Sequence, residues 1–420
     1  MKRENGRVMI KKILKYKDHS DFKYLYRSGQ YKLYKALSQF LASFILTWFL
    51  ANFTSKDFFG NYRFILSILG MLIIFSLPGM KDAILQSVAR GYDYSFIAGT
   101  KKAMKFSLSG GLALILISIY YLLTERIEFG LVFIVCAIFF PLVHTLDGFY
   151  AFLNAKKSFK KEFIYYSLIN SFMTVSVLLS VYLFGENLTT FMIVFFSSQL
   201  LFYLYFYLKF KSGIVDKKND RELFTFGWFL TKMNGLISIA NYVDQFVVGL
   251  FIGPANLAIY FIGIMLPNKI KAIINPIFYT LYPKFSADEM NLTKKKILII
   301  FLASCLISVG LVAVIPVFIK IFFSGFADSI IYGQFFSAAL LFIPLNIVFG
   351  LFFRAKKRKS AIQNPIIISR VSTIVLVFPS LYFFGIFGLI IVKILEQALN
   401  LIVNLFYFIT LTPHLFGEHI

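Results

Sequence analysis

The sequence predicts an all-α integral membrane protein with about twelve transmembrane helices in two homologous halves. Three observations predict this fold. Hydrophobic residues make up 59% of the 420 positions, against roughly 45–50% in soluble domains, and the mean hydropathy is +0.76. Apolar runs long enough to cross a membrane recur along the whole chain. In addition, one long segment occurs twice.

The apolar runs define the expected helices, because a membrane-spanning helix needs about 20 predominantly apolar residues. The expected spans are 36–52, 61–79, 104–124, 129–153, 163–184, 188–208, 224–252, 256–281, 297–322, 330–353, 362–384 and 386–411. The longest external connection is expected around residues 54–60. Connections this short leave no room for an outward-facing catalytic domain.

The repeated segment comprises residues 152–185 and 352–385, two hundred positions apart. Identical residue types recur at Phe152, Ala155, Lys156, Lys157, Val175, Val177, Ser180, Tyr182, Phe184 and Gly185 and at the corresponding positions of the second copy. Many membrane transporters are built from internal repeats of about half the chain length. The repeat therefore favours a transporter whose substrate pathway lies where the halves meet.

The 43 Lys and Arg residues are distributed unevenly over the two sides of the membrane. Most lie before the first span or in loops that follow even-numbered spans, whereas loops after odd-numbered spans hold Lys56, Arg63, Arg126 and Lys320. Under the positive-inside rule both termini are cytoplasmic. This distribution explains most of the formal net charge of +23 without a nucleic-acid partner. Basic residues before the first span are also suited to contact anionic membrane lipids.

Sequence motifs for common enzymes and cofactors do not occur in the chain. It contains no P-loop, no G-x-G-x-x-G, no H-E-x-x-H and no set of His, Cys and Asp at ligand spacing. Cys136 and Cys305 both fall inside apolar runs, so neither a disulfide framework nor a zinc site is indicated. We therefore expect no enzyme activity, no cofactor and no metal site.

Cations inside the expected spans are informative, because a charge at the bilayer centre costs at least about 2.5–3.5 kcal/mol and usually faces a cavity or a partner. Five occur, all in the second half: Lys232, Lys269, Lys271, Arg370 and Lys393. Near the cytoplasmic end, Lys269 is expected to extend to the interface. The other four are candidate substrate-binding residues, since a positive wall favours an anionic cargo and Arg is suited to bidentate phosphate contact.

Three acidic residues in or near the spans, Asp244, Glu396 and Asp147, are candidates for binding a coupling ion. A carboxyl group in a low-dielectric site can exchange a proton during transport. The alternative is structural: Asp244 or Glu396 would pair with Arg370, Lys393 would pair with Glu396, and Asp147 would be a polar group at a helix end.

A polar stripe is expected inside the second half. Lys393, Glu396, Gln397, Asn400 and Asn404 fall on one helical face of the last span, Asn241 shares a face with Asp244, and Asn268 and Asn275 share a stripe with Lys271. Such a stripe can line a hydrophilic passage. Alternatively, its amides form hydrogen bonds that hold helices together.

Short motifs in both halves resemble one transporter family. The first half contains Phe59-Gly60-Asn61-Tyr62, Leu77-Pro78-Gly79 and Ala89-Arg90-Gly91; the second contains Phe226-Gly227, Asn241 to Gly249, Gly253 to Tyr260 and Leu281-Tyr282-Pro283-Lys284-Phe285-Ser286. In order and spacing they resemble the polysaccharide transporters, the O-antigen-flippase (Wzx-type) branch of the multidrug/oligosaccharidyl-lipid/polysaccharide (MOP) exporter superfamily. The resemblance covers nearly the whole chain.

The resemblance implies a fold like that of the MATE exporters of this superfamily, with two six-helix lobes that open alternately to either side. The expected organisation is a basic cytoplasmic segment at 1–30, an N-lobe at 31–211, an inter-lobe loop at 212–223, a C-lobe at 224–411 and a cytoplasmic tail at 412–420.

Members of this family carry undecaprenyl-pyrophosphate-linked oligosaccharides from the cytoplasmic to the outer leaflet for O-antigen or capsule synthesis. The resemblance thus implies a flippase of the bacterial plasma (inner) membrane, with a polysaccharide polymerase as a candidate partner. The alternative is a cation-coupled multidrug exporter of the same superfamily. Members of that group tend to carry acidic residues, whereas this chain has more cations than acids inside its spans.

Overall fold

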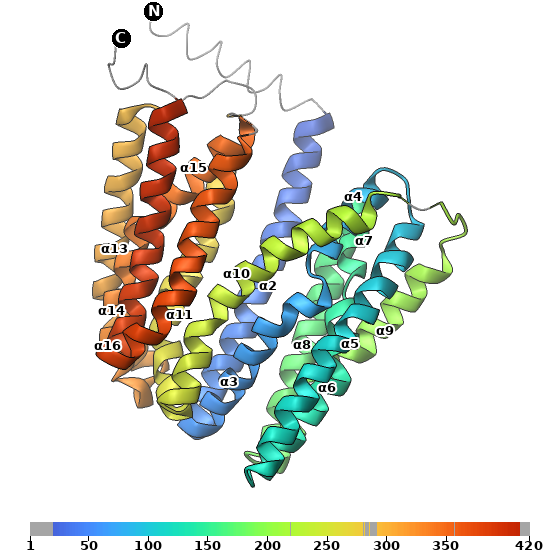
Figure 1. Cartoon of the computed structure of the whole chain (residues 1–420), viewed down its shortest axis with the longest axis horizontal. Helices are drawn as coiled ribbons and strands as arrows, with labels where there is room; N and C mark the ends of the chain where they lie inside the picture. Colours follow the sequence, from blue (N-terminus) through green and yellow to red (C-terminus); the bar gives the residue numbers. More distant parts are fainter. Residues whose placement is uncertain are drawn as a thin grey trace, which may run out of the picture. The chain divides into compact units, whose positions relative to one another are not determined.

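The computed structural model describes residues 20–218, 220–279, 281, 285, 292–356 and 358–411 (Figure 1). In these residues all regular elements are helical. The chain begins with α2 (Ser20–Phe53), α3 (Lys56–Leu72), η1 (Ile73–Ser76), α4 (Gly79–Ala89), α5 (Tyr94–Leu123), α6 (Ile127–Leu146), α7 (Phe149–Ala155), α8 (Phe159–Phe184) and α9 (Leu188–Ser212). It continues with α10 (Leu223–Phe251), α11 (Pro254–Tyr279), α13 (Lys294–Phe322), η2 (Ser324–Phe326), α14 (Ser329–Phe336), η3 (Ser337–Leu341), α15 (Ile343–Ala355) and α16 (Lys359–Leu411).

The prediction of an all-α membrane protein with about twelve membrane helices is confirmed. Among the described residues, ten helical segments are long and apolar enough to cross a bilayer. One of them, α16, has 53 residues and is divided by the non-helical backbone of Gly385, so it contains two expected spans. The 29-residue helix α10 covers a further expected span.

Parts of the expected organisation fall outside the described residues. These are residues 1–19 of the basic N-terminal segment, the tail at 412–420 and most of the motif at 281–286. The proposed lobe boundaries stay a prediction.

The expected external connection at residues 54–60 is much shorter in the structure. Helix α2 ends at Phe53 and α3 begins at Lys56. Ser55 caps α3, because its side chain accepts a hydrogen bond from the Phe58 N–H at 3.2 Å, which satisfies one of the free donors at the helix start. Arg63, which was counted with this external connection although the expected span 61–79 includes it, lies within α3, in the candidate span Lys56–Ser76.

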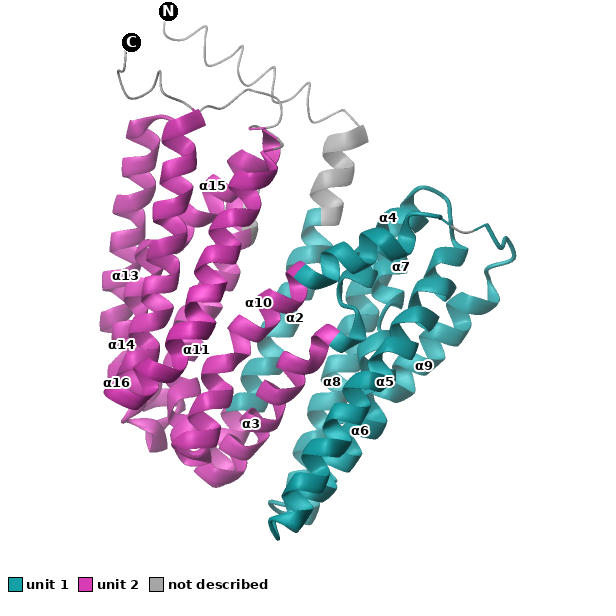
Figure 2. Cartoon of the chain, in the orientation of Figure 1, with its two compact units in different colours: residues 1–47, 75–232 teal, residues 48–74, 233–420 magenta. Residues whose placement is uncertain are grey.

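The chain divides into two compact units (Figure 2). Unit 1 comprises residues 1–47 and 75–232, and unit 2 comprises residues 48–74 and 233–420. The divisions fall within α2, η1 and α10. The whole of α3 therefore belongs to the same unit as the second half of the chain, which the sequence repeat alone does not indicate.

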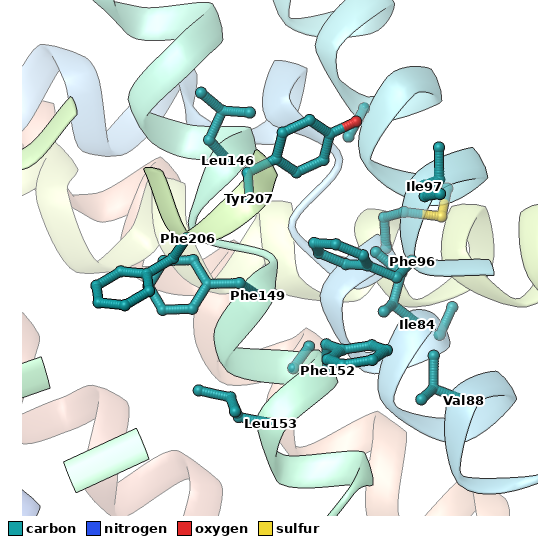
Figure 3. Close-up of a cluster of buried hydrophobic side chains, with 14 of the residues drawn as sticks. Ile84, Val88, Phe96, Ile97, Leu146, Phe149, Phe152, Leu153, Phe206 and Tyr207 are labelled. Carbon is teal, nitrogen blue, oxygen red and sulfur yellow. The ribbon is translucent and has the colours of Figure 1, made fainter. Parts of the chain in front are cut away.

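The core of unit 1 is rich in aromatic rings (Figure 3). Phe149 of α7 lies 5.2 Å from Phe206 of α9, and Phe96 of α5 lies 5.2 Å from Phe152 of α7, measured between ring centroids. Fully burying such a side chain contributes about 1.5–3 kcal/mol. The short helix α7 is thereby held against α5 and α9.

Unit 2 contains a very close helix contact between α3 and α11. A Cβ built on Gly60 would lie 1.8 Å from the carbonyl oxygen of Pro254, the first residue of α11. Only glycine permits the two backbones to approach this closely. Because Arg63 follows Gly60 by about one turn, the contact also sets the position of Arg63 beside α11.

A second cluster in unit 2 packs α15 against the last turns of α16. The ring of Phe408 lies 5.1 Å from Phe349 and 5.5 Å from Phe352, between centroids. All three side chains are buried. This cluster fixes α15 beside the part of α16 that carries the predicted polar stripe.

The repeated segments adopt the same local backbone conformation in both copies. The Lys156 N–H donates to the Phe152 carbonyl at 3.0 Å, and the Lys356 N–H donates to the Phe352 carbonyl at 3.0 Å. Gly185 and Gly385 have φ values of 65° and 57°, which an L side chain rarely adopts. The sequence repeat therefore corresponds to a structural one at these positions.

The connection into α10 is anchored within unit 1 by Asp220. Its carboxylate accepts hydrogen bonds from the Ser87 hydroxyl at 2.6 Å and from the Glu222 N–H at 3.0 Å, and Arg90 lies 3.8 Å away. The Ser87 hydrogen bond is the main cause that lowers the pKa of Asp220 below its ordinary value of 3.8.

Replacing Ser87 with alanine should lower the free energy of unfolding by about 1.5–3 kcal/mol, because a hydrogen bond to a charged group is lost. A depressed carboxyl pKa contributes stability that is present above the unfolded pKa and lost as pH falls through the folded value. The difference between Ser87→Ala and the wild type, measured by denaturant unfolding in detergent, should therefore be full at neutral pH and shrink below pH 3.8. A difference that stays constant with pH would contradict this account.

Candidate functional site

A polar cavity of about 480 Å³ lies within unit 2. Helices α3, α10, α11 and α16 supply its charged and amide side chains. The charged ones are Arg63, Asp244, Lys271, Arg370, Lys393 and Glu396, and the amides are Asn241, Gln245, Asn268, Asn275 and Gln397. We call it the cationic cavity, because its described lining has four basic residues and two acidic ones. Three of the four candidate substrate-binding residues thus come together here.

The first ion pair in the cationic cavity joins Arg370 and Glu396, both from α16. Nη1 of Arg370 lies 2.7 Å from Oε1 of Glu396 and donates to Oδ1 of Asn241 at 3.0 Å. Glu396 also accepts hydrogen bonds from the Thr373 hydroxyl at 2.9 Å and from the Gln397 amide at 3.0 Å. Its side chain is only 2% exposed, against 15% for Arg370. Glu396 is therefore a well-satisfied buried carboxylate that holds Arg370 at the cavity surface.

The second ion pair joins Lys393 of α16 and Asp244 of α10, with Nζ 3.4 Å from Oδ1. Lys393 also donates to the Ala240 carbonyl at 2.9 Å, and the Tyr260 hydroxyl donates to Asp244 at 2.7 Å. The sequence analysis considered an ion pair between Lys393 and Glu396. In the structure Lys393 pairs with Asp244 instead. Arg370 forms its ion pair with Glu396, and Lys393 forms its ion pair with Asp244, because α10 packs close to this face of α16.

Arg63 is a cavity residue that the sequence reasoning missed. Its guanidinium carbon lies 3.5 Å from the centroid of the Phe261 ring, and Nη2 donates to Oε1 of Gln245 at 2.8 Å. Arginine over an aromatic face is a favourable cation–π arrangement. The signal was the capping Ser55 ahead of the apolar run, which places the helix start early enough to include Arg63.

Lys271 of α11 differs from Arg370 and Lys393 in having no salt bridge. Within the described residues, no carboxylate oxygen lies within 4.0 Å of its Nζ. The same holds for Arg63. Two of the four cations in the cationic cavity are therefore not neutralised by a direct acidic partner, and they give the cavity its positive excess.

A smaller cavity of about 220 Å³ adjoins the cationic cavity and shares Lys271, Asn275 and Arg370 with it. It brings together the remaining members of the predicted stripe, Asn400 and Asn404. The stripe thus does both things expected of it: it lines space, and its amides bond to one another, since Asn404 donates to Asn400 at 2.8 Å. We call this space the amide cavity.

Two predicted site residues lie in unit 1 and line neither cavity. The ammonium of Lys232 lies 6.0 Å from the Trp228 ring centroid, and Lys232 is not among the lining residues of either cavity. Asp147 accepts a hydrogen bond from Lys81 at 2.6 Å. Nearby, Nε2 of His144 is buried and has no hydrogen-bond partner among the residues that the structure describes.

The residues described by the structure contain no group of three or more His, Cys, Asp or Glu side chains that could hold a metal ion. Asp244 and Glu396 are each matched by a basic side chain. The basic and amide side chains that line the cationic cavity are suited to contact anionic or hydroxylated groups.

The sequence of this chain matches one known protein family. A family model described as polysaccharide biosynthesis protein matches residues 29–288. No curated protein sequence matches the chain.

Solved transporter structures share the fold at low sequence identity. The lipid II flippase MurJ in an inward closed conformation is similar with a TM-score of 0.70 and 14% identity, covering 90% of this chain and 87% of that one. The eukaryotic MATE transporter AtDTX14 has a TM-score of 0.65 and 15% identity, covering 92% and 95%. An outward-facing multidrug resistance MATE family transporter of the MOP superfamily has a TM-score of 0.62 and 14% identity, covering 96% and 98%. These similarities show the fold.

Proposed function

Because this chain belongs to the polysaccharide biosynthesis protein family, we propose that it is a flippase. It would carry undecaprenyl-pyrophosphate-linked oligosaccharide units from the cytoplasmic to the outer leaflet by alternating access, for surface polysaccharide such as O-antigen or capsule. A flippase must be a multi-pass membrane protein, and this chain has several membrane-spanning helices and the fold of the MOP transporters.

One observation carries the proposal: the cationic cavity places four basic side chains among membrane helices around two carboxylates. A sugar pyrophosphate cannot cross hydrocarbon, because desolvating its charges and hydroxyl groups without partners costs too much free energy. Keeping an excess of positive charge within a membrane is also costly. An anionic substrate that enters the cavity would offset both costs.

Lys271 and Arg370 are the residues we assign to the pyrophosphate. Lys271 has no competing carboxylate among the described residues, and the guanidinium of Arg370 can form two parallel hydrogen bonds to a phosphate. Arg63, fixed by Phe261 and Gln245, would add a third positive group. Lys393 is held by Asp244 and would contribute mainly through its field.

The membrane potential can set the direction in which the substrate is transported. With the inside negative, each negative charge moved outward gains about 2.3 kcal/mol per 100 mV. We therefore propose that the potential drives export of the anionic head group. Exchange of a proton or another cation at Asp244, Glu396 or Asp147 is the alternative drive, and each of these carboxylates has a basic partner to release.

We also propose a membrane location and a partner for this protein. The distribution of basic residues favours cytoplasmic termini, and membership of the polysaccharide biosynthesis protein family favours a bacterial plasma (inner) membrane. The polyprenyl tail would stay in lipid, no covalent bond would be made or broken, and a polysaccharide polymerase would use the exported unit.

A cation-coupled multidrug exporter is the competing function, and it shares the fold of the MATE neighbours. A cationic drug would be attracted by carboxylates that have no basic partner of their own. Here Asp244 and Glu396 each already have a cation, which favours an anionic substrate.

Replacing Lys271 with alanine should lower export of the lipid-linked glycan at least about tenfold, because one charge-assisted contact worth about 1.5–3 kcal/mol is lost. The measurement is the amount of inward-facing lipid-linked glycan and of surface polysaccharide in cells whose chromosomal copy has been replaced by the variant. Lys320→Ala, which removes an exposed lysine from α13 of the same unit, is the matched control and should export normally.

Normal export by Lys271→Ala at normal protein level would defeat the assignment of Lys271 to the substrate. Changed sensitivity to cationic drugs on expression, with unchanged glycan export on deletion, would favour the multidrug exporter.

A further inference from the structure

The amide cavity has a lining that differs from that of the cationic cavity. Its described lining contains three cations, Lys271, Arg354 and Arg370, and no carboxylate. Five amide side chains also line it: Asn275, Asn346, Gln397, Asn400 and Asn404. A space with this composition accepts negative charge and hydroxyl groups and offers no acidic partner to a cation.

Polar and aliphatic side chains of α16 line the amide cavity from different parts of that helix. The amides of Gln397, Asn400 and Asn404 come from the second half of α16, whereas Ile362, Pro365 and Ile366 come from the first half of the same helix. A pyranose ring presents hydroxyl groups at its edge and C–H groups on its faces. The lining thus offers amides to the hydroxyl groups and aliphatic side chains to the C–H faces.

The hydrogen-bond network leaves capacity for a ligand. Both N–H groups of the Asn404 amide are used, one to Asn346 at 3.0 Å and one to Asn400 at 2.8 Å. Asn346 in turn donates to the Gln397 carbonyl at 2.9 Å. The two N–H donors of Asn400 and the oxygen of Asn404 have no partner within the described residues. Together they offer both donors and an acceptor, as a sugar hydroxyl requires.

We propose that the amide cavity binds the first sugar of the lipid-linked glycan, a neutral or acetamido hexose joined through its anomeric carbon to the pyrophosphate. This inference rests on the proposed function and specifies where the glycan part of the substrate lies. The pyrophosphate then lies at Lys271 and Arg370, the cations that line both cavities.

Covalent connectivity supports this arrangement. The first sugar is bonded directly to the phosphate, so its site must adjoin the phosphate site, and the two cavities share Lys271 and Arg370. Size supports it as well. A volume of about 220 Å³ is below the roughly 300–1,000 Å³ of sites for drug-sized ligands, which suits one sugar ring and not a whole repeat unit.

The test compares three phosphate monoesters of similar charge: methyl phosphate, glucose 1-phosphate and N-acetylglucosamine 1-phosphate. Their affinities for the purified full-length protein are measured by calorimetry in detergent. We expect at least one sugar phosphate to bind about tenfold more tightly than methyl phosphate, as one or two added hydrogen bonds would give. In Asn400→Ala this advantage should fall below about threefold, with the affinity for methyl phosphate unchanged.

Asn364→Ala is the matched control. Asn364 is also on α16, but it bonds to the Tyr407 hydroxyl and lines neither cavity, so the sugar advantage should persist. Asn404→Ala is the second test variant, and thermal unfolding shows which of the two remains folded.

The outcomes separate the two proposals. Equal binding of all three esters by the wild type, or a sugar advantage that Asn400→Ala keeps, overturns the sugar site and leaves the proposed function standing. If no ester binds, or if binding is unaffected in Arg370→Ala/Glu396→Gln, the cationic cavity itself is not a phosphate site and both proposals fail.

Discussion

Replacing Arg370 with alanine should lower the free energy of unfolding by about 3–5 kcal/mol, because it leaves a buried carboxylate without its cation. Glu396 is 2% exposed and lies 2.7 Å from Arg370. Its hydrogen bonds from Thr373 and Gln397 remain, but they do not neutralise the charge. The measurement is denaturant-induced unfolding of the purified protein in detergent.

Arg370→Ala/Glu396→Gln should regain most of this stability, because no charge is then buried alone and the glutamine can still accept from Thr373. Export by the double variant should stay low, since Arg370 is assigned to the substrate. Recovery of export together with stability would mean that Arg370 is structural only. Lys218→Ala is the control: its pair with Asp216 is 3.8 Å long and exposed on both sides, so its loss should cost less than about 1 kcal/mol.

Replacing Gly60 with alanine should destabilise unit 2 by about 3 kcal/mol or more, at the upper end of the cost of overpacking. The new Cβ would lie 1.8 Å from the Pro254 carbonyl oxygen. This atom belongs to the backbone, so a rotamer change cannot relieve the clash and α3 must move away from α11. Export should fall as well, because Arg63 moves with α3.

Gly310→Ala is the matched control for Gly60→Ala. Gly310 lies inside α13, and a Cβ there meets nothing within 4 Å. Alanine at such a helical position should stabilise by about 0.5–1 kcal/mol. Both variants are compared by the same unfolding assay, and similar effects for the two would contradict a close α3–α11 contact at Gly60.

Hydropathy was sufficient to predict the membrane helices, because their length and apolar content are set by the bilayer. The helical period was sufficient to align Gln397, Asn400 and Asn404 on one face of α16, and these three residues do line one cavity. Gly60 belongs to a motif quoted from sequence, and its close approach to Pro254 gives a physical reason for that glycine.

Other features depend on distances between helices, which spacing along one helix does not give. The partner of Lys393 is Asp244 on α10 and not Glu396 three residues away on the same helix. Arg63 was missed because its role follows from an early start of α3 and from contacts with Phe261 and Gln245. Lys232 was included because it lies within an apolar run, yet α10 carries it into unit 1.

Because the turns at Gly185 and Gly385 match, residues of the second copy of the repeat can be compared with their counterparts in the first. At the shared offset, Leu200 and Leu204 of α9 stand where α16 has Asn400 and Asn404. A helix at this position of the repeat can therefore be built with leucine. The repeated scaffold does not itself require amides here, so leucine at both asparagine positions of α16 should be compatible with the backbone.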